Sequence, residues 1–255
     1  MSYELRQFDP KTCKPHRMWL IIGQRGTGKS RLLQDIVYKT KDNYDIAMAM
    51  TATTSTVKDF QKFIPSRLIY KNGYDFQKAD VMLTTCKQFV SKGKGRRLLN
   101  IQDDVMFESG VLKSKTQKEL HFNGRHALTT QMSTAQYCMD IPSNIRGNID
   151  YVLALRETTV SNKKKLYEYF FGLFPSFKEF DRVFMQCTTN FGALVIDKTQ
   201  PTADIENCLF HYKAMENLPT FRVGKPYFFF LSDILDELSK RKQKNNNKDK
   251  TIKII

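Results

Sequence analysis

The feature that most constrains this chain is the octapeptide GQRGTGKS at residues 23–30. It directly follows the apolar run MWLII and directly precedes a stretch whose apolar residues recur at helical spacing. Glycines let backbone N–H groups curl around phosphate oxygens without a Cβ in the way, and the positive end of the following helix points at the same anion. The pattern GxxxxGKS between a strand and a helix therefore predicts a phosphate-binding loop, or P-loop, in an α/β fold.

The residues of this loop have distinct expected roles. The ammonium group of Lys29 would contact the β- and γ-phosphates of a nucleotide, and the hydroxyl of Ser30 can bind Mg²⁺. The predicted nucleotide-binding residues are Gly23, Gln24, Arg25, Gly26, Thr27, Gly28, Lys29, Ser30 and Arg31. The loop alone does not separate ATPases, GTPases and kinases.

Short apolar runs alternate with longer helical stretches between residues 18 and about 157. Because the runs show little alternation, they are typical of strands buried on both faces of a parallel sheet. Strands joined by helices predict right-handed crossovers and a three-layer α/β sandwich with a mainly parallel central sheet. The predicted strands are 18–22, 45–50, 98–101, 127–131 and 149–155, and the predicted helices follow residue 28 and cover 57–63, 76–90 and 111–122.

The texture of the chain changes after Glu157. Residues 161–186 are predicted to be helical, residues 191–197 and 208–213 to form a pair of strands, and residues 231–238 to lie in a last amphipathic helix.

The sequence predicts one domain and a tail. We expect a P-loop domain over 1–239, with its core at about 16–157 and a small helical and hairpin extension at 158–239. Residues 240–253 carry seven basic residues and one acid, so the tail at 240–255 is predicted to be disordered.

A pair of acids closes the strand predicted at 98–101. The sequence LLNIQDD places Asp103 and Asp104 at the carboxyl end of that strand, which is where ligands of α/β sheets bind. Asp103 would hold Mg²⁺ through its waters, and Asp104 could polarise an attacking water. The alternative is that the two acids cap the next helix or are simply solvated.

Two further positions could complete a site for phosphoryl transfer. Gln131 ends the next predicted strand, from which it could orient water or sense hydrolysis. Arg146 follows a short helix that begins at a proline, and it could reach the nucleotide of a neighbouring subunit, where an arginine stabilises developing charge. The alternative for Arg146 is a structural or DNA-facing role, and Arg156 is a competing candidate.

Four segments together resemble a known superfamily. GQRGTGKS, LLNIQDD, LTTQM and IPSNIRGNIDYV are similar to motifs of the FtsK/HerA superfamily, and more closely of its genome-packaging ATPases from nucleocytoplasmic large DNA viruses, the poxvirus type. FGALVID and CLFHYKA resemble the C-terminal hairpin of that branch, so the resemblance covers about residues 16–215. It implies an ASCE, RecA-like core, ATP as fuel, a homo-oligomeric ring, and double-stranded DNA driven into a preformed capsid.

The resemblance also implies roles for residues. Residues 23–30 would be the Walker A motif, Asp103 and Asp104 the Walker B pair, and Gln131 the sensor. At Asp104 the sequence departs from the Glu that is usual in the wider superfamily. The candidate catalytic residues are then Lys29, Asp104, Gln131 and Arg146, and the candidate ligands of Mg²⁺ are Ser30 and Asp103.

The charge of the chain favours a polyanionic partner. Forty-one Lys and Arg stand against 26 Asp and Glu, a net charge of +15. Glycine and lysine without interleaved aromatic residues predict sequence-independent contacts with DNA phosphates. The candidate contacts are Lys92, Lys94, Arg96, Arg97, Lys113 and Lys115. The basic tail could bind DNA, a capsid or virion component, or a membrane surface.

The cysteines and the apolar runs bear on location. Five scattered cysteines without a CxxC pair favour a reducing compartment. The N-terminus lacks the apolar region of a secretion signal, and no apolar run is long enough to cross a bilayer. We therefore expect a soluble protein of the host-cell cytoplasm or of the virion.

Three other functions fit the same motifs less well. A nucleoside or nucleotide kinase would need an acceptor site and an arginine-rich lid, and a GTPase would need a guanine-reading NKxD motif, which the sequence lacks. A DNA-binding scaffold whose nucleotide only sets its conformation is the alternative from outside the enzymes.

Overall fold

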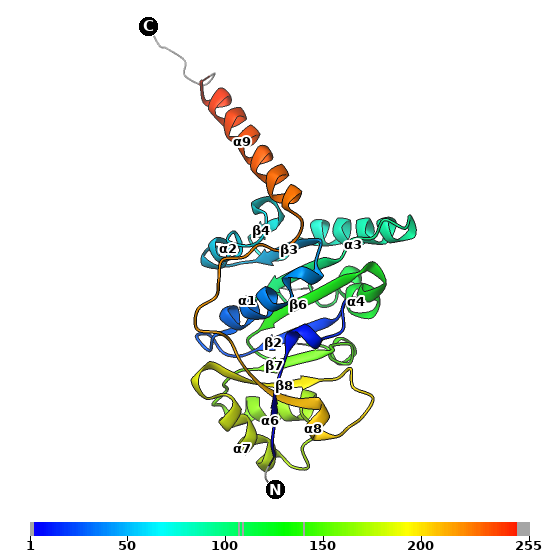
Figure 1. Ribbon diagram of the computed structural model, residues 1–255, viewed down its shortest axis with the longest axis vertical. Helices are drawn as coiled ribbons and strands as arrows, with labels where there is room; N and C mark the ends of the chain where they lie inside the picture. The colour runs from blue at the N-terminus through cyan, green and yellow to red at the C-terminus, as the bar shows by residue number, and fades with distance from the viewer. Residues whose placement is uncertain (1–2, 107, 109, 140, 249–255) are drawn as a thin grey trace.

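A nine-stranded sheet forms the centre of the molecule (Figure 1). The computed structural model describes residues 3–106, 108, 110–139 and 141–248, with the side chains of 243–248 left aside. The strands are β1 (Arg6–Gln7), β2 (Met18–Ile22), β3 (Ile46–Thr51), β4 (Ile69–Lys71), β5 (Leu98–Asp103), β6 (Thr129–Ala135), β7 (Tyr151–Ala154), β8 (Gly192–Asp197) and β9 (Leu209–Lys213). Their spatial order is β1-β9-β8-β7-β2-β6-β5-β3-β4.

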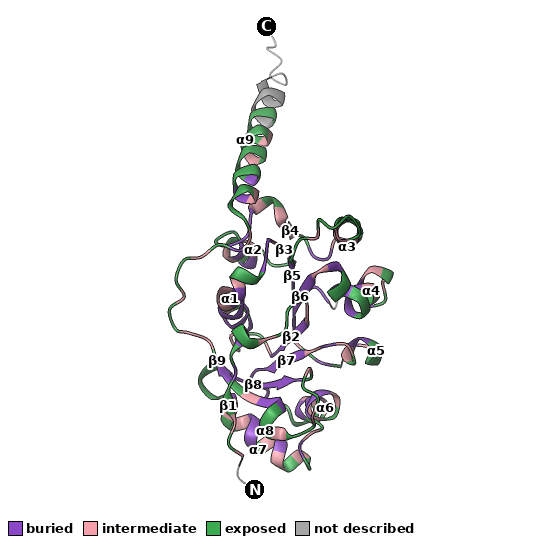
Figure 2. Cartoon of the chain, turned by 45° about the vertical axis from the view of Figure 1, so that its right-hand side comes forward, coloured by how far each residue is buried: buried purple, intermediate pink, exposed green. Residues whose placement is uncertain are grey.

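The sheet is mainly parallel. Strands β4, β3, β5, β6, β2 and β7 all run in one direction, while β8 is antiparallel to its neighbours β7 and β9. The α-helices are α1 (Lys29–Thr40), α2 (Thr54–Phe60), α3 (Phe76–Ser91), α4 (Lys115–Asn123), α5 (Ser143–Arg146), α6 (Val160–Phe170), α7 (Phe177–Cys187), α8 (Ile205–Cys208) and α9 (Pro226–Lys248). Figure 2 shows α1 and α2 on one face and α3 to α6 on the other, which confirms the predicted three-layer α/β fold.

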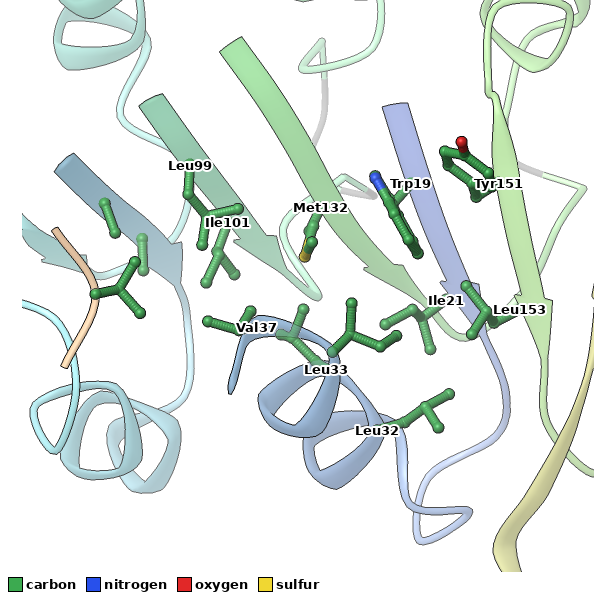
Figure 3. Close-up of a cluster of buried hydrophobic side chains, with 14 of the residues drawn as sticks. Trp19, Ile21, Leu32, Leu33, Val37, Leu99, Ile101, Met132, Tyr151 and Leu153 are labelled. Carbon is green, nitrogen blue, oxygen red and sulfur yellow. The ribbon is translucent and has the colours of Figure 1, made fainter. Parts of the chain in front are cut away.

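Helix α1 packs its predicted apolar stripe onto one face of the sheet. Leu33 and Val37 are fully buried against Ile21 of β2, Ile101 of β5 and Met132 of β6 (Figure 3). Because α1 is held along its length, the loop that joins β2 to α1 has fixed ends. On the other face, phenylalanines of α6 and α7 pack onto β2, β7 and β8, and residues of α3 pack onto β3 and β5.

Strand β6 is longer than the sequence suggested. We predicted that it ends at Gln131, yet it continues to Ala135 with every residue buried. Hydrogen bonds between side chains make this burial tolerable: Asn100 Nδ2 donates to Gln131 Oε1 at 2.6 Å, and Gln131 Nε2 donates to Ser133 Oγ at 2.8 Å.

The predicted pair of C-terminal strands is present as β8 and β9, and it extends the central sheet through β7. The short edge strands β1 and β4, of two and three residues, were not predicted.

The prediction of disorder from residue 240 is wrong for its first part, since α9 continues through Lys248. Unbranched Lys, Arg and Gln lose little freedom in a helix that has already been nucleated. Residues 249–255 of the predicted tail lie outside the described part of the chain.

Replacing Leu33 should test the packing that holds α1. Leu33→Ala removes a fully buried side chain and is expected to lower the free energy of unfolding by about 2–5 kcal/mol. Val160→Ala is the control, because Val160 is 54% exposed and its loss should change stability by less than about 0.5 kcal/mol. Urea denaturation measures both, and equal effects would contradict this account of the core.

Candidate functional site

The loop of residues 23–28 turns tightly between β2 and α1. Gly26 and Gly28 have φ angles of +82° and +97°, a left-handed conformation that favours glycine. A Cβ at Gly23 would lie 2.6 Å from Thr27 Oγ1, whereas one at Gly26 would meet nothing within 4 Å. The loop is therefore packed at its base and open at its tip, as a phosphate-binding loop must be.

Lys29 lies folded inside this loop. Its Nζ donates hydrogen bonds to the carbonyl oxygens of Gly23 at 2.7 Å and Gln24 at 3.2 Å. Burial lowers the pKa of Lys29, and the nearby carboxylates of Asp104 and Asp103 oppose that shift. The ammonium group thus contacts the loop and lies near the two carboxylates.

The two acids lie where the sequence placed them, at the carboxyl end of β5. Asp103 is 5% exposed, and Thr134 Oγ1 donates to its Oδ1 at 2.8 Å. Asp104 has a φ of +52°, and its N–H donates to the same Thr134 oxygen at 2.9 Å. Burial raises the pKa of Asp103, which the hydrogen bond from Thr134 and the charge of Lys29 partly offset. One threonine of β6 therefore contacts both acids, through the carboxylate of Asp103 and the backbone of Asp104.

The structure contradicts the sensor position predicted for Gln131. Its Cα is paired with Met18 at the start of β2 and with Asn100 of β5, four residues before β6 ends, or about 13 Å along the strand. Gln131 is fully buried in the polar contacts between β5 and β6. It serves the packing of the sheet, at the end remote from the P-loop.

Gln136 occupies the place where a sensor was expected. It is the first residue after β6, it is half-buried, and its Nε2 donates to Asp104 Oδ2 at 3.4 Å. Gln136 was not predicted, because the strand was expected to end at Gln131. Met132 and Ala135 within β6 were the available signal that the strand continues.

The two candidate arginines lie at opposite edges of the sheet. Arg146 precedes β7, its guanidinium carbon is 3.7 Å from the centre of the Tyr169 ring, and its Nη1 donates to Ile141 O at 2.6 Å. Arg156 is exposed, two residues beyond β7 and thus near the end of β2 that bears the P-loop. Arg146 therefore lies away from the P-loop of its own subunit. That either arginine acts on the nucleotide of a neighbouring subunit stays a prediction.

A buried glutamate braces the P-loop and was not predicted. Glu157 is 4% exposed, and its Oε1 accepts a hydrogen bond from Gln24 Nε2 at 2.7 Å. It also accepts from the Thr159 N–H at 2.8 Å and from Asn162 Nδ2 at 3.0 Å. The carboxylate ties the first turn of the P-loop to the segment between β7 and α6.

A cavity of about 680 Å³ opens beside the start of α1. Phe191 lines it, is 67% exposed, and has a φ of +61°. Its ring lies 3.3 Å from the point where a Cβ on Gly28 would sit. Arg31 forms part of the wall and donates to the carbonyl oxygens of Met215 and Glu216. An exposed aromatic ring this close to the P-loop offers a stacking surface for a nucleobase.

The residues predicted to contact DNA fall into two groups at opposite edges of the sheet. Exposed Lys92, Lys94 and Arg96 precede β5, whereas exposed Lys113 and Lys115 follow it and lie toward the edge with the P-loop. Arg97 differs from these, because its guanidinium forms an ion pair with Asp45 at 3.2 Å.

The residues present suit Mg²⁺ bound with a nucleotide rather than by protein alone. Within the described residues there is no group of three or more His, Cys, Asp or Glu that could hold a metal. Mg²⁺ commonly takes one or two protein oxygens and completes its shell with water and phosphate. Ser30 at the start of α1 and Asp103 at the end of β5 can supply those two oxygens.

Comparisons with known proteins agree with this architecture. No protein-family model matches the chain. The packaging NTPase B204 of Sulfolobus turreted icosahedral virus 2, solved in complex with AMPPCP, superposes with a TM-score of 0.57 over 79% of this chain and 100% of B204, at 14% identity. The complex of B204 with ATP-gammaS gives the same TM-score of 0.57, over 79% of this chain and 99% of B204. The sheet topology and the loop at residues 23–30 together place the chain in the class of P-loop NTPase folds.

Relatives in sequence come from viruses. The uncharacterized protein 088R of Invertebrate iridescent virus 3 is 34% identical over 194 residues, which are 76% of this chain and 74% of that protein. The uncharacterized protein L437 of Acanthamoeba polyphaga mimivirus is 29% identical over 86% of this chain and 80% of that protein. The chain belongs to the same protein family as 088R.

Thr134 generates the first prediction for the site. Thr134→Val keeps the shape of the side chain but removes the donor to Asp103 and the acceptor for the Asp104 N–H, so the free energy of unfolding should fall by about 1–3 kcal/mol. Thr54→Val, at an exposed position of α2, is the matched control and should leave stability nearly unchanged. If Thr134→Val left the free energy of unfolding unchanged in chemical denaturation, this threonine would not hold the acids.

Proposed function

We propose that the protein is an ATP-driven translocase of double-stranded DNA that packages a viral genome. The observation that carries this proposal is the placement of Lys29, Asp103 and Asp104 at one edge of the sheet, with their charges close enough to shift the pKa of Lys29. A P-loop facing paired carboxylates is the arrangement that phosphoryl transfer to water requires.

The chain's own residues divide the work. Open N–H groups at the tip of the P-loop bind the phosphates, and Lys29 exchanges its carbonyl partners for the β- and γ-phosphates. Ser30 and Asp103 would hold Mg²⁺, which would neutralise phosphate charge when bound. Asp104 accepts a proton from the attacking water, and Gln136, hydrogen-bonded to Asp104, orients that water. Phe191 stacks on the adenine.

Packaging is supported by charge and by the neighbours. A net charge of +15 suits a polyanion, and the neighbour B204 is a genome-packaging NTPase from a virus. Among the described residues no helix is both long and apolar enough to span a bilayer. We propose that the protein acts in the host-cell cytoplasm or in the virion. It forms a homo-oligomeric ring, in which Arg146 or Arg156 contacts the nucleotide of the neighbouring subunit.

Lys29→Ala tests the proposed function directly. The variant is expected to lose ATP turnover by at least about 10³-fold, because the phosphates lose the ammonium that stabilises their developing charge. Lys58→Ala, an exposed lysine on α2, should turn over ATP as the wild type does. Duplex DNA should raise the wild-type rate. Turnover that persists in Lys29→Ala would remove the P-loop from the reaction, and a rate indifferent to DNA would count against translocation.

A second test should distinguish the roles of Gln136 and Gln131. Gln136→Ala is expected to slow turnover by about 10²-fold with ATP binding retained, because the attacking water loses its orientation. Gln131→Ala should instead lower stability by about 1–3 kcal/mol, since it leaves the Asn100 amide unpaired, and should keep turnover within a few-fold. The reverse pattern in single-turnover kinetics and denaturation would restore Gln131 as the sensor.

A further inference from the structure

The end of the sheet at which the parallel strands begin lies opposite the P-loop, and we call it the amino edge. It carries positive charge from segments that are far apart in sequence. The parallel strands β5, β6, β2 and β7 begin at this amino edge, and antiparallel β8 ends there. The segments that line it are 11–17, 92–97, 121–128, 146–150 and 197–200, and together they hold ten Lys and Arg against two Asp. One of the ten, Arg97, forms an ion pair with Asp45, which precedes β3 at the same edge.

Neither of the two acids offsets this charge at the surface. Asp150 Oδ2 accepts the Met18 N–H at 2.9 Å, and its Oδ1 lies 3.8 Å from Arg17 Nη1. Asp197 is 6% exposed and accepts hydrogen bonds from the Thr199 N–H and Gln200 Nε2. Both carboxylates are committed within the chain, so the free charges of the edge are cationic.

A small pocket of about 140 Å³ lies in the middle of this edge. Arg17, Arg125 and Lys198 line it from three different segments, with Asp150 as the acid among them. The Nε of Arg17 is buried and makes no hydrogen bond within the described part of the chain. A buried guanidinium N–H without an acceptor is costly. Because Arg17 lines the pocket, an anion bound there could offer an acceptor to its guanidinium.

The cationic row extends beyond the pocket on one side. Lys92, Lys94 and Arg96 are exposed in the loop before β5, and the Leu98 N–H donates to Leu128 O in the segment that carries Arg125. From β5 to β8 the edge crosses four strand spacings, or about 19 Å. A DNA duplex carries one phosphate charge per about 1.7 Å of its axis, so such a row faces many phosphates at once.

We propose that the amino edge of the sheet is a binding surface for the backbone of duplex DNA, and that the pocket between Arg17, Arg125 and Lys198 seats one of its phosphates. The inference rests on the proposed function and assigns the DNA to a definite surface. Nucleotide and DNA then bind at opposite edges of one sheet. Lys113 and Lys115, which face the nucleotide edge, lie outside this surface.

The test is the salt dependence of duplex DNA binding by the full chain, followed by fluorescence anisotropy. Arg125→Ala combined with Lys198→Ala removes two exposed cations and spares Arg17, whose loss would leave Asp150 unpaired. The slope of log K against log salt should fall by about 2, and binding should weaken several-fold. Lys58→Ala combined with Lys178→Ala removes the same charge from exposed positions on α2 and α7, and should bind as the wild type does.

The outcomes separate this inference from the proposed function. DNA-stimulated turnover in the wild type, together with normal DNA binding by the Arg125→Ala, Lys198→Ala variant, overturns the amino-edge surface and leaves the translocase intact. Equal weakening in both double variants also overturns it, because net charge alone then explains binding. Stabilisation of the wild type by inorganic phosphate at constant ionic strength, with DNA binding unaffected in the variant, would assign the pocket to a free phosphate instead. Thermal melting confirms that each variant is folded.

Discussion

The structure depends on the parallel register of β5, β6 and β2. In that register the P-loop leaves the end of β2, the acids leave the end of β5, and β6 lies between them. Thr134 near the end of β6 contacts both acids, so the middle strand sets the relation between loop and carboxylates. A slip of one residue would turn Thr134 to the other face of the sheet and undo both hydrogen bonds.

The same register gives the sheet two chemically different edges. At the carboxyl edge, glycine-rich backbone, one buried ammonium and two carboxylates are arranged around a space for phosphates. At the amino edge, loops from five segments contribute cations with few free acids. The strands that join the two edges are buried.

The parts of the site that depend on neighbours in sequence could be predicted, and the parts that depend on the tertiary fold could not. Gly23–Ser30 and the Asp103–Asp104 pair are local patterns with a required strand before them, and the structure places both at the expected edge. Gln131 was mistaken for Gln136 because a buried polar residue in a strand looks like the end of that strand. Its partner Asn100, which makes the burial tolerable, lies 31 residues away and is invisible to local pattern. Phe191 and the cations of the amino edge come from distant segments that only the sheet order brings together.

The central claim is that the P-loop and the acids of β5 form one site for Mg²⁺ and ATP. The most direct measurement is a crystal structure of the protein with AMPPCP and Mg²⁺. We expect the γ-phosphate in contact with Lys29 Nζ and Mg²⁺ held by Ser30 and by Asp103 or its waters, with Gln136 and Asp104 on the side from which water attacks. A nucleotide bound elsewhere, or a metal out of reach of Asp103, would contradict it.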